Sequence, residues 1–279
     1  MKQPGGLMKK LFGGGKTDEV MHRSVAENIY HCCVHKTASQ WIARILAADE
    51  TYRASGLHTY RYQRELPGGA DIRKIGERTF DKPFPPHTIV TPIYIGWENF
   101  IAIPKPSSWR AFFVMRDPRD ILVSWYFSWK HSHPVMSDIG EQREKLNAAS
   151  EDEGLCYGIE QLHEQGLFAA LRSWIDASKR SPNAAVFRYE DLIDANQLAV
   201  FQKLFAHCDI AMPEEKLREV LAANSFAALA KGRERGVEDV TSHLRKGVHG
   251  DWKNHFTPRV SEAFRATTGD LVETLGYQQ

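Results

Sequence analysis

The sequence predicts a single α/β domain in which a central parallel β-sheet is flanked by helices. Short runs rich in Val, Ile, Phe and Tyr alternate along the chain with longer stretches whose apolar residues recur three and four positions apart. This alternation is typical of parallel strands that are connected through helices. With 279 residues, of which 42% are hydrophobic, the chain is long enough to bury one large core.

The predicted elements follow this pattern from one end of the chain to the other. We expect strands at residues 28–34, 88–91, 111–115 and 184–188. We expect helices at residues 40–48, 118–130, 160–179, 196–207, 214–222 and 258–274. Segments 49–87 and 131–158 are polar and irregular, and we expect them to be loops that wall or cover a substrate site.

The first residues are expected to form a flexible tail, at 1–24, ahead of a domain that spans 25–279. The tail contains the run GGGKT at 13–17, which looks like the end of a phosphate-binding P-loop. That motif requires a glycine where Lys10 stands and a buried strand before it, and both are missing. A glycine-rich linker is therefore the favoured interpretation of this run.

The overall composition excludes several classes of function. Lys and Arg number 36 against 35 Asp and Glu, so no basic field is available to hold nucleic acid or an anionic membrane. No apolar run has the length of a signal peptide core or a membrane span. The cysteines Cys32, Cys33, Cys156 and Cys208 lack the spacing of a zinc site or a disulfide framework. We therefore expect a soluble cytoplasmic protein with reduced thiols.

A first candidate anion site follows the strand that ends at Val34. We expect Ser39 to cap the next helix, whose first amides have no partner within the helix and point at whatever lies before them. Lys36 adds a positive charge, Thr37 a hydroxyl, and the small Ala38 allows close approach of the backbone. An ordinary capped helix with a solvated lysine explains this segment equally well.

A second candidate site follows the strand that ends before Arg116. Asp117 is a good helix cap and Pro118 suits the first helical position, so a helix should begin there. Ser124 lies about two turns along that helix, where its hydroxyl can face the same side as the Arg116 guanidinium and bind a phosphate. Taken alone, the segment favours the alternative of a local salt bridge between Arg116 and Asp120.

These two segments, together with YEDL at 189–192 and RKGVHGDWKN at 245–254, resemble the cytosolic type of sulfotransferases that depend on 3′-phosphoadenosine-5′-phosphosulfate (PAPS). The order and spacing of the motifs match over residues 28–257. The resemblance implies a sulfotransferase fold related to the P-loop NTPases. It also implies transfer of a sulfuryl group from PAPS to a hydroxyl or amine, with adenosine 3′,5′-bisphosphate (PAP) as product and no metal.

The resemblance also implies roles for individual residues. The 5′-phosphosulfate would be held by Lys36, Thr37, Ala38, Ser39, Gln40 and Trp41. The 3′-phosphate would be held by Arg116, Ser124, Arg245, Lys246 and Gly247. The adenine would be surrounded by Trp41, Tyr189, Ser225 and Phe226. Ala38 and Gln40 depart from the usual glycine and threonine of the family, so some contacts of the first turn must differ.

The expected catalytic residues are Lys36, which would neutralise or protonate the leaving phosphate, and Ser124. The histidine that removes the acceptor proton in the cytosolic family is missing, because Val90, Thr91 and Pro92 stand at its place. Groups that could replace it are His58, His87, Tyr94 and Glu98, of which we favour Glu98. The acceptor pocket is expected to include His58, Tyr94, Trp125, Phe127 and Trp129, with His131 or His133.

Two other functions remain open from the sequence. A nucleotide-dependent kinase on a related fold would use similar phosphate binding, although the glycine-lysine signature is misplaced for one. A catalytically inactive nucleotide-binding relative would explain the missing histidine. The histidines lack matched partners for a metal. The acceptor can be a small molecule, a lipid or a glycan, and neither its identity nor the oligomeric state follows from the sequence.

Overall fold

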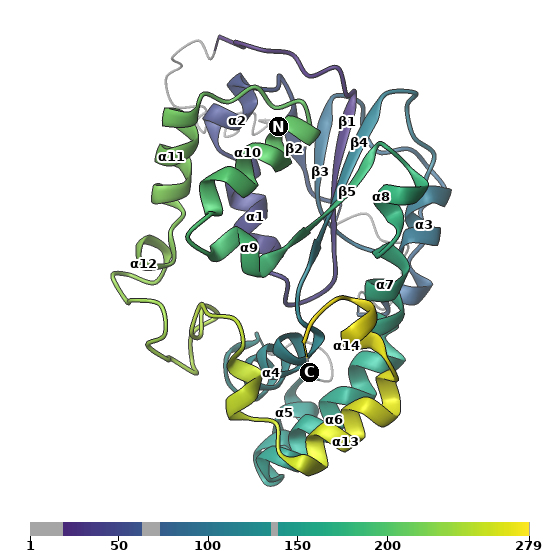
Figure 1. Ribbon diagram of the computed structural model, residues 1–279, viewed down its shortest axis with the longest axis vertical. Helices are drawn as coiled ribbons and strands as arrows, with labels where there is room; N and C mark the ends of the chain where they lie inside the picture. Colours follow the sequence, from purple (N-terminus) through teal and green to yellow (C-terminus); the bar gives the residue numbers. More distant parts are fainter. Residues whose placement is uncertain (1–18, 63–72, 135–138, 279) are drawn as a thin grey trace, which may run out of the picture.

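The computed structural model describes residues 19–62, 73–134 and 139–278. A five-stranded sheet lies at its centre, with the strand order β2-β3-β1-β4-β5 and every neighbouring pair parallel (Figure 1). The strands are β1 (Asn28–Cys33), β2 (His58–Tyr60), β3 (Thr88–Tyr94), β4 (Trp109–Met115) and β5 (Ala184–Arg188). The predicted parallel sheet is confirmed. The sequence pattern misses β2, because three partly exposed residues at a sheet edge show no periodicity.

Helices cover both faces of the sheet and one of its ends (Figure 1). One face carries α1 (Ser39–Leu46), α2 (Asp49–Arg53), α9 (Tyr189–Ile193), α10 (Gln197–His207) and α11 (Glu214–Ala223). The other face carries α3 (Trp97–Ala102), α7 (Leu167–Trp174) and α8 (Ala177–Arg180). A third group lies beyond the carboxyl ends of the strands and comprises α4 (Pro118–Phe127), α5 (Ile139–Ala148), α6 (Glu151–Glu164), α13 (Pro258–Thr268) and α14 (Leu271–Thr274).

Short turns complete the chain between these layers. They are the 3-10 helices η1 (Ile75–Glu77) and η3 (Asp251–Asn254), the π-helix η2 (Ser128–Ser132) and the single turn α12 (Phe226–Leu229). No helix in the described part of the chain is both long and apolar enough to cross a membrane.

The sheet separates two hydrophobic clusters, one on each face. All six residues of β1 are buried, with Ile29 in one cluster and Tyr30 in the other. A strand that is covered on both faces needs apolar residues at every position, which is why the sequence shows a continuous run here. Trp125 and Trp174 are among the largest fully buried side chains and fill the cluster beneath α4 and α7.

The prediction that residues 131–158 are irregular is wrong, because α5 and half of α6 lie there. The sequence pattern does not predict the first half of α6, because that half contains two glycines and glycine is a poor helix former. A Cβ on Gly154 would lie 2.5 Å from the ring of Tyr126, and one on Gly158 would lie 2.8 Å from Leu122. Both glycines are therefore required where α6 packs closely on α4.

Two predicted helices are each divided by a glycine. The stretch 160–179 breaks at Gly166 and the stretch 258–274 at Gly269, and both glycines have positive φ angles, of 74° and 63°. These angles end a helix, and glycine adopts them without steric cost.

The carboxyl ends of the strands lie level with one another. Cys33 at the end of β1 is paired with Tyr94 of β3, and Met115 at the end of β4 is paired with Arg188 of β5. The segments that leave these strands therefore open at one edge of the sheet. This is the edge at which ligands bind in parallel α/β proteins.

Candidate active site

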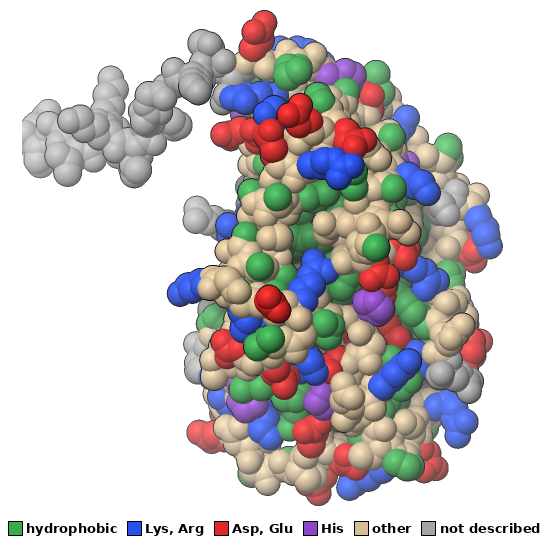
Figure 2. Space-filling view, turned by 60° about the vertical axis from the view of Figure 1, so that its left-hand side comes forward, with side chains coloured by type: hydrophobic (Ala, Val, Ile, Leu, Met, Phe, Trp, Pro, Cys, Tyr) green, Lys and Arg blue, Asp and Glu red, His purple; other side chains and the backbone are tan. Residues whose placement is uncertain are grey.

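A cavity of about 580 Å³ opens at this edge of the sheet, between the strands and the helical layer beyond them. On the face shown in Figure 2, Lys and Arg side chains gather near the middle of the molecule, next to hydrophobic ones. The cavity is lined by His35, Lys36, Ala38, Ser39, Gln40, Trp41, Tyr62, Arg78, Tyr94, Arg116, Ser124, Trp129, His133, Tyr189, Ile193, Asn224, Phe226, Leu229, Arg235, His243, Leu244, Arg245, Lys246, Gly247 and Val248.

The turn between β1 and α1 forms one wall of the cavity. Lys36 and Ala38 have φ angles of 67° and 58°, in the left-handed region that costs a residue with a Cβ about 1–2 kcal/mol. The prediction that Ser39 caps α1 is wrong: Ala38 is the N-cap and makes no side-chain hydrogen bond. The Ser39 hydroxyl instead lies 2.9 Å from the hydroxyl of Tyr94.

Thr37 is buried and donates to the Val34 carbonyl at 2.8 Å, so its side chain stabilises the turn and does not line the cavity.

Lys36 lines the cavity, and its ammonium group lies 5.8 Å from the centroid of the Trp129 ring. Desolvation lowers the pKa of Lys36 to about 7, and the positive charge of Arg116 acts in the same direction. Near neutral pH this lysine can therefore hold or release a proton at little cost.

Arg116 connects the second candidate site to the first. Its Nη1 donates to the carbonyl oxygen of Lys36 at 2.7 Å, and its guanidinium lies 4.5 Å from the centroid of the Tyr189 ring. Its Nε is buried and has no hydrogen-bond partner among the described residues. The alternative of a local salt bridge between Arg116 and Asp120 is wrong, because Asp120 accepts from the backbone amides of Gly250, at 2.6 Å, and Trp252, at 3.0 Å.

The helix after Arg116 begins as predicted. The Asp117 side chain accepts from the backbone amide of Arg119 at 2.9 Å, and Pro118 is the first helical residue. This start directs Arg116 toward the turn at Lys36, and it places Ser124 on the wall of the cavity.

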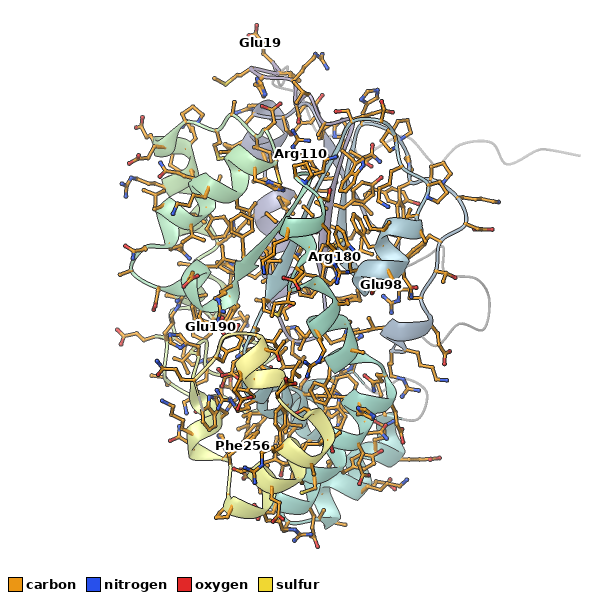
Figure 3. All side chains as sticks on the ribbon, turned by 45° about the vertical axis from the view of Figure 1, so that its right-hand side comes forward. Glu19, Glu98, Arg110, Arg180, Glu190 and Phe256 are labelled. Carbon is orange, nitrogen blue, oxygen red and sulfur yellow. The ribbon has the colours of Figure 1, made fainter. Side chains whose placement is uncertain are left out.

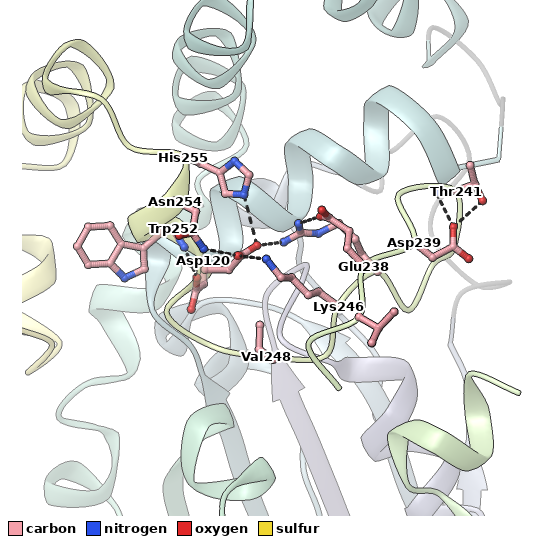
Figure 4. A network of polar contacts seen from close by, with 12 residues as sticks. Asp120, Glu238, Asp239, Thr241, Lys246, Val248, Trp252, Asn254 and His255 are labelled. Carbon is pink, nitrogen blue, oxygen red and sulfur yellow. Dashed lines mark hydrogen bonds and ion pairs between the residues drawn. The ribbon is translucent and has the colours of Figure 1, made fainter. Parts of the chain in front are cut away.

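The loop at residues 245–254 is held by one buried carboxylate, that of Asp251 (Figure 4). It pairs with Arg245, accepts from Lys246 at 2.6 Å, and lies 3.4 Å from His255. Burial alone would raise the pKa of the Asp251 carboxyl, but hydrogen bonds from His255, Lys246, Asn254 and Arg245 hold it well below its usual range. The loop is thus fixed in place with two cations at the cavity.

Most of the predicted site residues converge on the cavity. Those that line it are Lys36, Ala38, Ser39, Gln40, Trp41, Tyr94, Arg116, Ser124, Tyr189, Phe226, Arg245, Lys246 and Gly247. Ser225 does not line the cavity, because its hydroxyl caps α12 by accepting from the Ala228 amide. It positions Phe226, which does line the cavity.

The structure does not bring Glu98 or His58 to the cavity. Glu98 lies on α3, its side chain is 68% exposed, and its carboxylate pairs with Arg180 at 3.3 Å (Figure 3). The ring of His58 stacks on Tyr52, with 4.2 Å between the centroids. An exposed carboxylate paired on the outer surface cannot remove a proton from a molecule bound in the cavity.

Three residues predicted for the acceptor pocket do not line the cavity. Trp125 is fully buried and stacks on Trp129, with 5.1 Å between ring centroids. Phe127 supports Arg245, whose guanidinium lies 4.4 Å from the centroid of the Phe127 ring. His131 is exposed and stacks on Phe127 at 6.2 Å.

His133 lines the cavity next to Lys36 and Trp129. Its Nδ1 lies 3.2 Å from the carbonyl oxygen of Pro134, and because a carbonyl only accepts, Nδ1 carries the hydrogen and Nε2 keeps its lone pair. Burial lowers the pKa of His133, and the charges of Lys36 and Arg143 lower it further, against the opposing effect of the Pro134 carbonyl. The ring is therefore neutral at pH 7 and can accept a proton.

Several lining residues carry no sequence signal of their own. Tyr62 and Arg78 come from the segment predicted as a substrate wall, where no motif distinguishes them from their neighbours. Asn224, Arg235 and His243 reach the cavity from loops that have no periodic pattern. Within residues 19–62, 73–134 and 139–278, no group of His, Cys, Asp or Glu has the arrangement of a metal site.

The chain is similar to known proteins over most of its length. A family model described as the sulfotransferase domain matches residues 34–276. The chain is 29% identical over 212 residues to sulfotransferase 2A2 of Mus musculus, covering 72% of this chain and 66% of the relative. It is 28% identical over 171 residues to cytosolic sulfotransferase 3 of Arabidopsis thaliana, covering 56% of this chain and 51% of the relative. The matches thus span less than two thirds of these relatives' own lengths.

Solved structures of the same fold include two that were determined with PAP. Mouse sulfotransferase SULT7A1 complexed with PAP has a TM-score of 0.60 at 16% identity, over 92% of this chain and 89% of that chain. Retinol dehydratase in complex with androsterone and inactive cofactor PAP has a TM-score of 0.55 at 10% identity, over 93% of this chain and 85% of that chain. At these identities the likeness concerns the fold.

Proposed function

Because this chain belongs to the sulfotransferase family, we propose that it transfers the sulfuryl group of PAPS to a hydroxyl or amine of an acceptor molecule. The observation that carries the proposal is the hydrogen bond between Arg116 and the carbonyl of Lys36, which joins two predicted phosphate sites in one cavity. A nucleotide such as PAPS, which carries a 3′-phosphate and a 5′-phosphosulfate, needs such a pair of sites.

The residues present fit such a nucleotide. Arg116 offers a buried Nε that has no hydrogen-bond partner in the described structure, and Arg245 and Lys246 add two further cations. Tyr189 and Trp41 supply flat faces for a base, and Trp41 is fixed because its indole donates to the Asn224 carbonyl at 2.8 Å. We assign the 3′-phosphate to Arg116, Ser124 and the loop at 245–247, and the phosphosulfate to the turn at Lys36.

The reaction is an in-line displacement at sulfur. A bond forms between the acceptor oxygen or nitrogen and sulfur, while the bond between sulfur and the bridging oxygen of the leaving phosphate breaks. Lys36 neutralises the charge that develops on that oxygen, because it is the cation of the turn to which we assign the phosphosulfate and it lines the cavity. Nε2 of His133 takes the proton that the acceptor loses. The protein thus contributes positioning, charge stabilisation and one proton acceptor.

PAP should stabilise the protein selectively. A ligand that binds only the folded state at 100 times its Kd adds about 2.7 kcal/mol. For a chain of this size that corresponds to a rise in Tm of roughly 5–10 °C. We expect this rise with PAP in a thermal-shift assay, a small rise with ATP and magnesium, and a much reduced PAP response in the variant Arg116→Met.

The two alternative functions have different outcomes in the same assay. An equal or larger shift with ATP and magnesium would favour a kinase. A PAP shift without turnover of radiolabelled PAPS across an acceptor screen would indicate an inactive nucleotide-binding relative. A cytosolic location belongs to the proposal as well, in keeping with the name of the Arabidopsis thaliana relative.

Gly247→Ala should weaken PAP binding by about tenfold or more, because its φ angle of 71° is strained for alanine and the new Cβ would lie 2.4 Å from the Phe226 ring. Isothermal titration calorimetry with PAP measures the change. The matched control is Gly250→Ala in the same loop, where φ is 74° and no atom lies within 4 Å of the added Cβ. If both variants lose the same affinity, the contact between Gly247 and Phe226 is not needed for binding.

A further inference from the structure

A row of hydrogen-bonded side chains runs along the cavity and ends at the turn between β1 and α1. The amide nitrogen of Gln40 lies 3.3 Å from the Tyr94 hydroxyl, and that hydroxyl lies 2.9 Å from the hydroxyl of Ser39. At the outer end, Nη1 of the exposed Arg61 donates to the amide oxygen of Gln40 at 3.1 Å. We call Arg61, Gln40, Tyr94 and Ser39 the relay, and the last three of them line the cavity.

The outer end of the relay sets the orientation of the Gln40 amide. A guanidinium group has only donors, so the amide turns its oxygen toward Arg61. The amide nitrogen then faces Tyr94 and donates to the tyrosine oxygen. The Tyr94 hydroxyl is therefore an acceptor on the side of Gln40.

The Tyr94 hydroxyl also keeps its own hydrogen at neutral pH. The residue is 8% exposed, and burial raises the pKa of the phenol above its usual range, against the opposing effect of the hydrogen bonds with Ser39 and Gln40. Its oxygen accepts from Gln40, and the Ser39 oxygen lies within hydrogen-bond distance on the other side. The phenol can therefore pass a hydrogen bond from Gln40 on to Ser39.

A bound phosphate decides the direction of the last hydrogen bond of the relay. Either hydroxyl of the pair Tyr94 and Ser39 can be the donor. Phosphate oxygens only accept, so a phosphate beside Ser39 takes the serine hydrogen, and the Ser39 oxygen is left to accept from Tyr94. Every hydrogen bond of the relay then runs in one direction, from Arg61 to the phosphate.

We propose that Tyr94 is a positioning residue for sulfuryl transfer, which donates to the Ser39 oxygen and thereby directs the Ser39 hydrogen at the 5′-phosphate of the bound nucleotide. A hydroxyl that accepts a hydrogen bond becomes a better donor, so each member of the relay strengthens the next. Gln40, which stands where a threonine is usual in the family, connects Tyr94 to Arg61. This inference rests on the proposed function, because it takes the phosphosulfate to lie at this turn.

The test compares two ligands that differ only in the 5′-phosphate, PAP and adenosine 3′-phosphate, by calorimetry. Tyr94→Phe removes the hydroxyl and keeps the ring, which stacks on His35 with 4.4 Å between the centroids. We expect this variant to lose affinity for PAP by roughly 3- to 10-fold and affinity for adenosine 3′-phosphate by less than about twofold. The relay serves only the 5′ end of the nucleotide.

A double-mutant cycle distinguishes positioning from a general structural role. Ser39→Ala should weaken PAP binding by roughly 10- to 100-fold, because it removes a hydrogen bond to a charged group. When Tyr94→Phe is added to Ser39→Ala, the further loss should be below about twofold, because Tyr94 acts through the serine hydroxyl. A structural role of Tyr94 predicts the same loss in both backgrounds.

Two further variants complete the series. Gln40→Leu removes the donor to Tyr94, so its loss of PAP affinity should largely disappear in the Tyr94→Phe background. The matched control is Tyr30→Phe, which removes another buried tyrosine hydroxyl, one that accepts from Asn28 at 3.4 Å. Tyr30→Phe should change the affinity for PAP by less than about twofold.

The inference is overturned if Tyr94→Phe keeps its full affinity for PAP, loses affinity for both ligands equally, or shows the same loss in the Ser39→Ala background. These outcomes leave the proposed function intact, because the unaltered protein still binds PAP. Failure of PAP to bind the unaltered protein is a separate result that overturns the proposed function itself.

Discussion

Lys36→Ala is expected to lower kcat by about 100- to 1,000-fold while it changes the affinity for PAP by less than about fivefold. In the proposed mechanism the lysine, which lines the cavity, neutralises the negative charge that develops on the leaving phosphate. In the same proposal Arg116, Arg245 and Lys246, which also line the cavity, supply most of the attraction for the nucleotide in the ground state. Single-turnover rates with PAPS and calorimetry with PAP separate these two effects.

Lys246→Ala is the matched control for this prediction, because it removes another cation of the same cavity. The Lys246 ammonium is held by Asp251 on the late loop, so its loss should weaken PAP binding more than it lowers kcat. Equal losses of turnover and PAP affinity in Lys36→Ala would show that Lys36 serves mainly to bind the nucleotide.

The pH dependence of the unaltered enzyme provides a second readout of Lys36. Its pKa of about 7 means that kcat/KM for PAPS should fall as pH rises through neutrality, because only the ammonium form stabilises the leaving group. Bound phosphates raise the pKa of a neighbouring lysine, so the corresponding fall in kcat should occur at higher pH. The charge of an arginine does not titrate in this range, so in Lys36→Arg neither kcat/KM nor kcat should decrease as the pH rises.

His133→Gln is expected to lower kcat by about 100-fold or more, because glutamine fills a similar volume but cannot accept a proton. In the unaltered enzyme the rate should rise with pH through the pKa of His133, which burial and the charges of Lys36 and Arg143 place below the usual value. This rise of the rate with pH should disappear in the variant. Rates measured from pH 5 to 9 with one acceptor test the assignment.

Two controls accompany His133→Gln. His131→Gln alters an exposed histidine two residues away, and Glu98→Gln alters the carboxylate that the sequence favoured as the base. Both should keep kcat within about twofold, as substitutions at exposed positions away from a site usually do. If the rate of His133→Gln still rises with pH as in the unaltered enzyme, or if Glu98→Gln loses much of its kcat, His133 is not the proton acceptor.

Much of the fold follows from local patterns. Four strands of the sheet are predicted correctly because a strand that is buried on both faces requires a continuous apolar run, as at Asn28–Cys33. The start of α4 is predicted because Asp117 and Pro118 act within a few residues of the backbone that they cap. The first half of α6 is missed because Gly154 and Gly158 serve the packing on α4, which no local pattern records.

The sequence by itself predicted the parallel sheet and the family, and it indicated the two turns to which we assign the phosphates, because each depends on residues that are close together in the chain or on a motif of fixed spacing. Only the tertiary structure decided that Arg116 reaches the Lys36 carbonyl and not Asp120, and that His133 and Arg78 share a cavity from which Glu98 is excluded. The physical reason is that such contacts join segments far apart in the chain, 80 residues for Arg116 and Lys36 and 130 for Asp120 and Gly250, and the packing of whole helices against the sheet sets their distances.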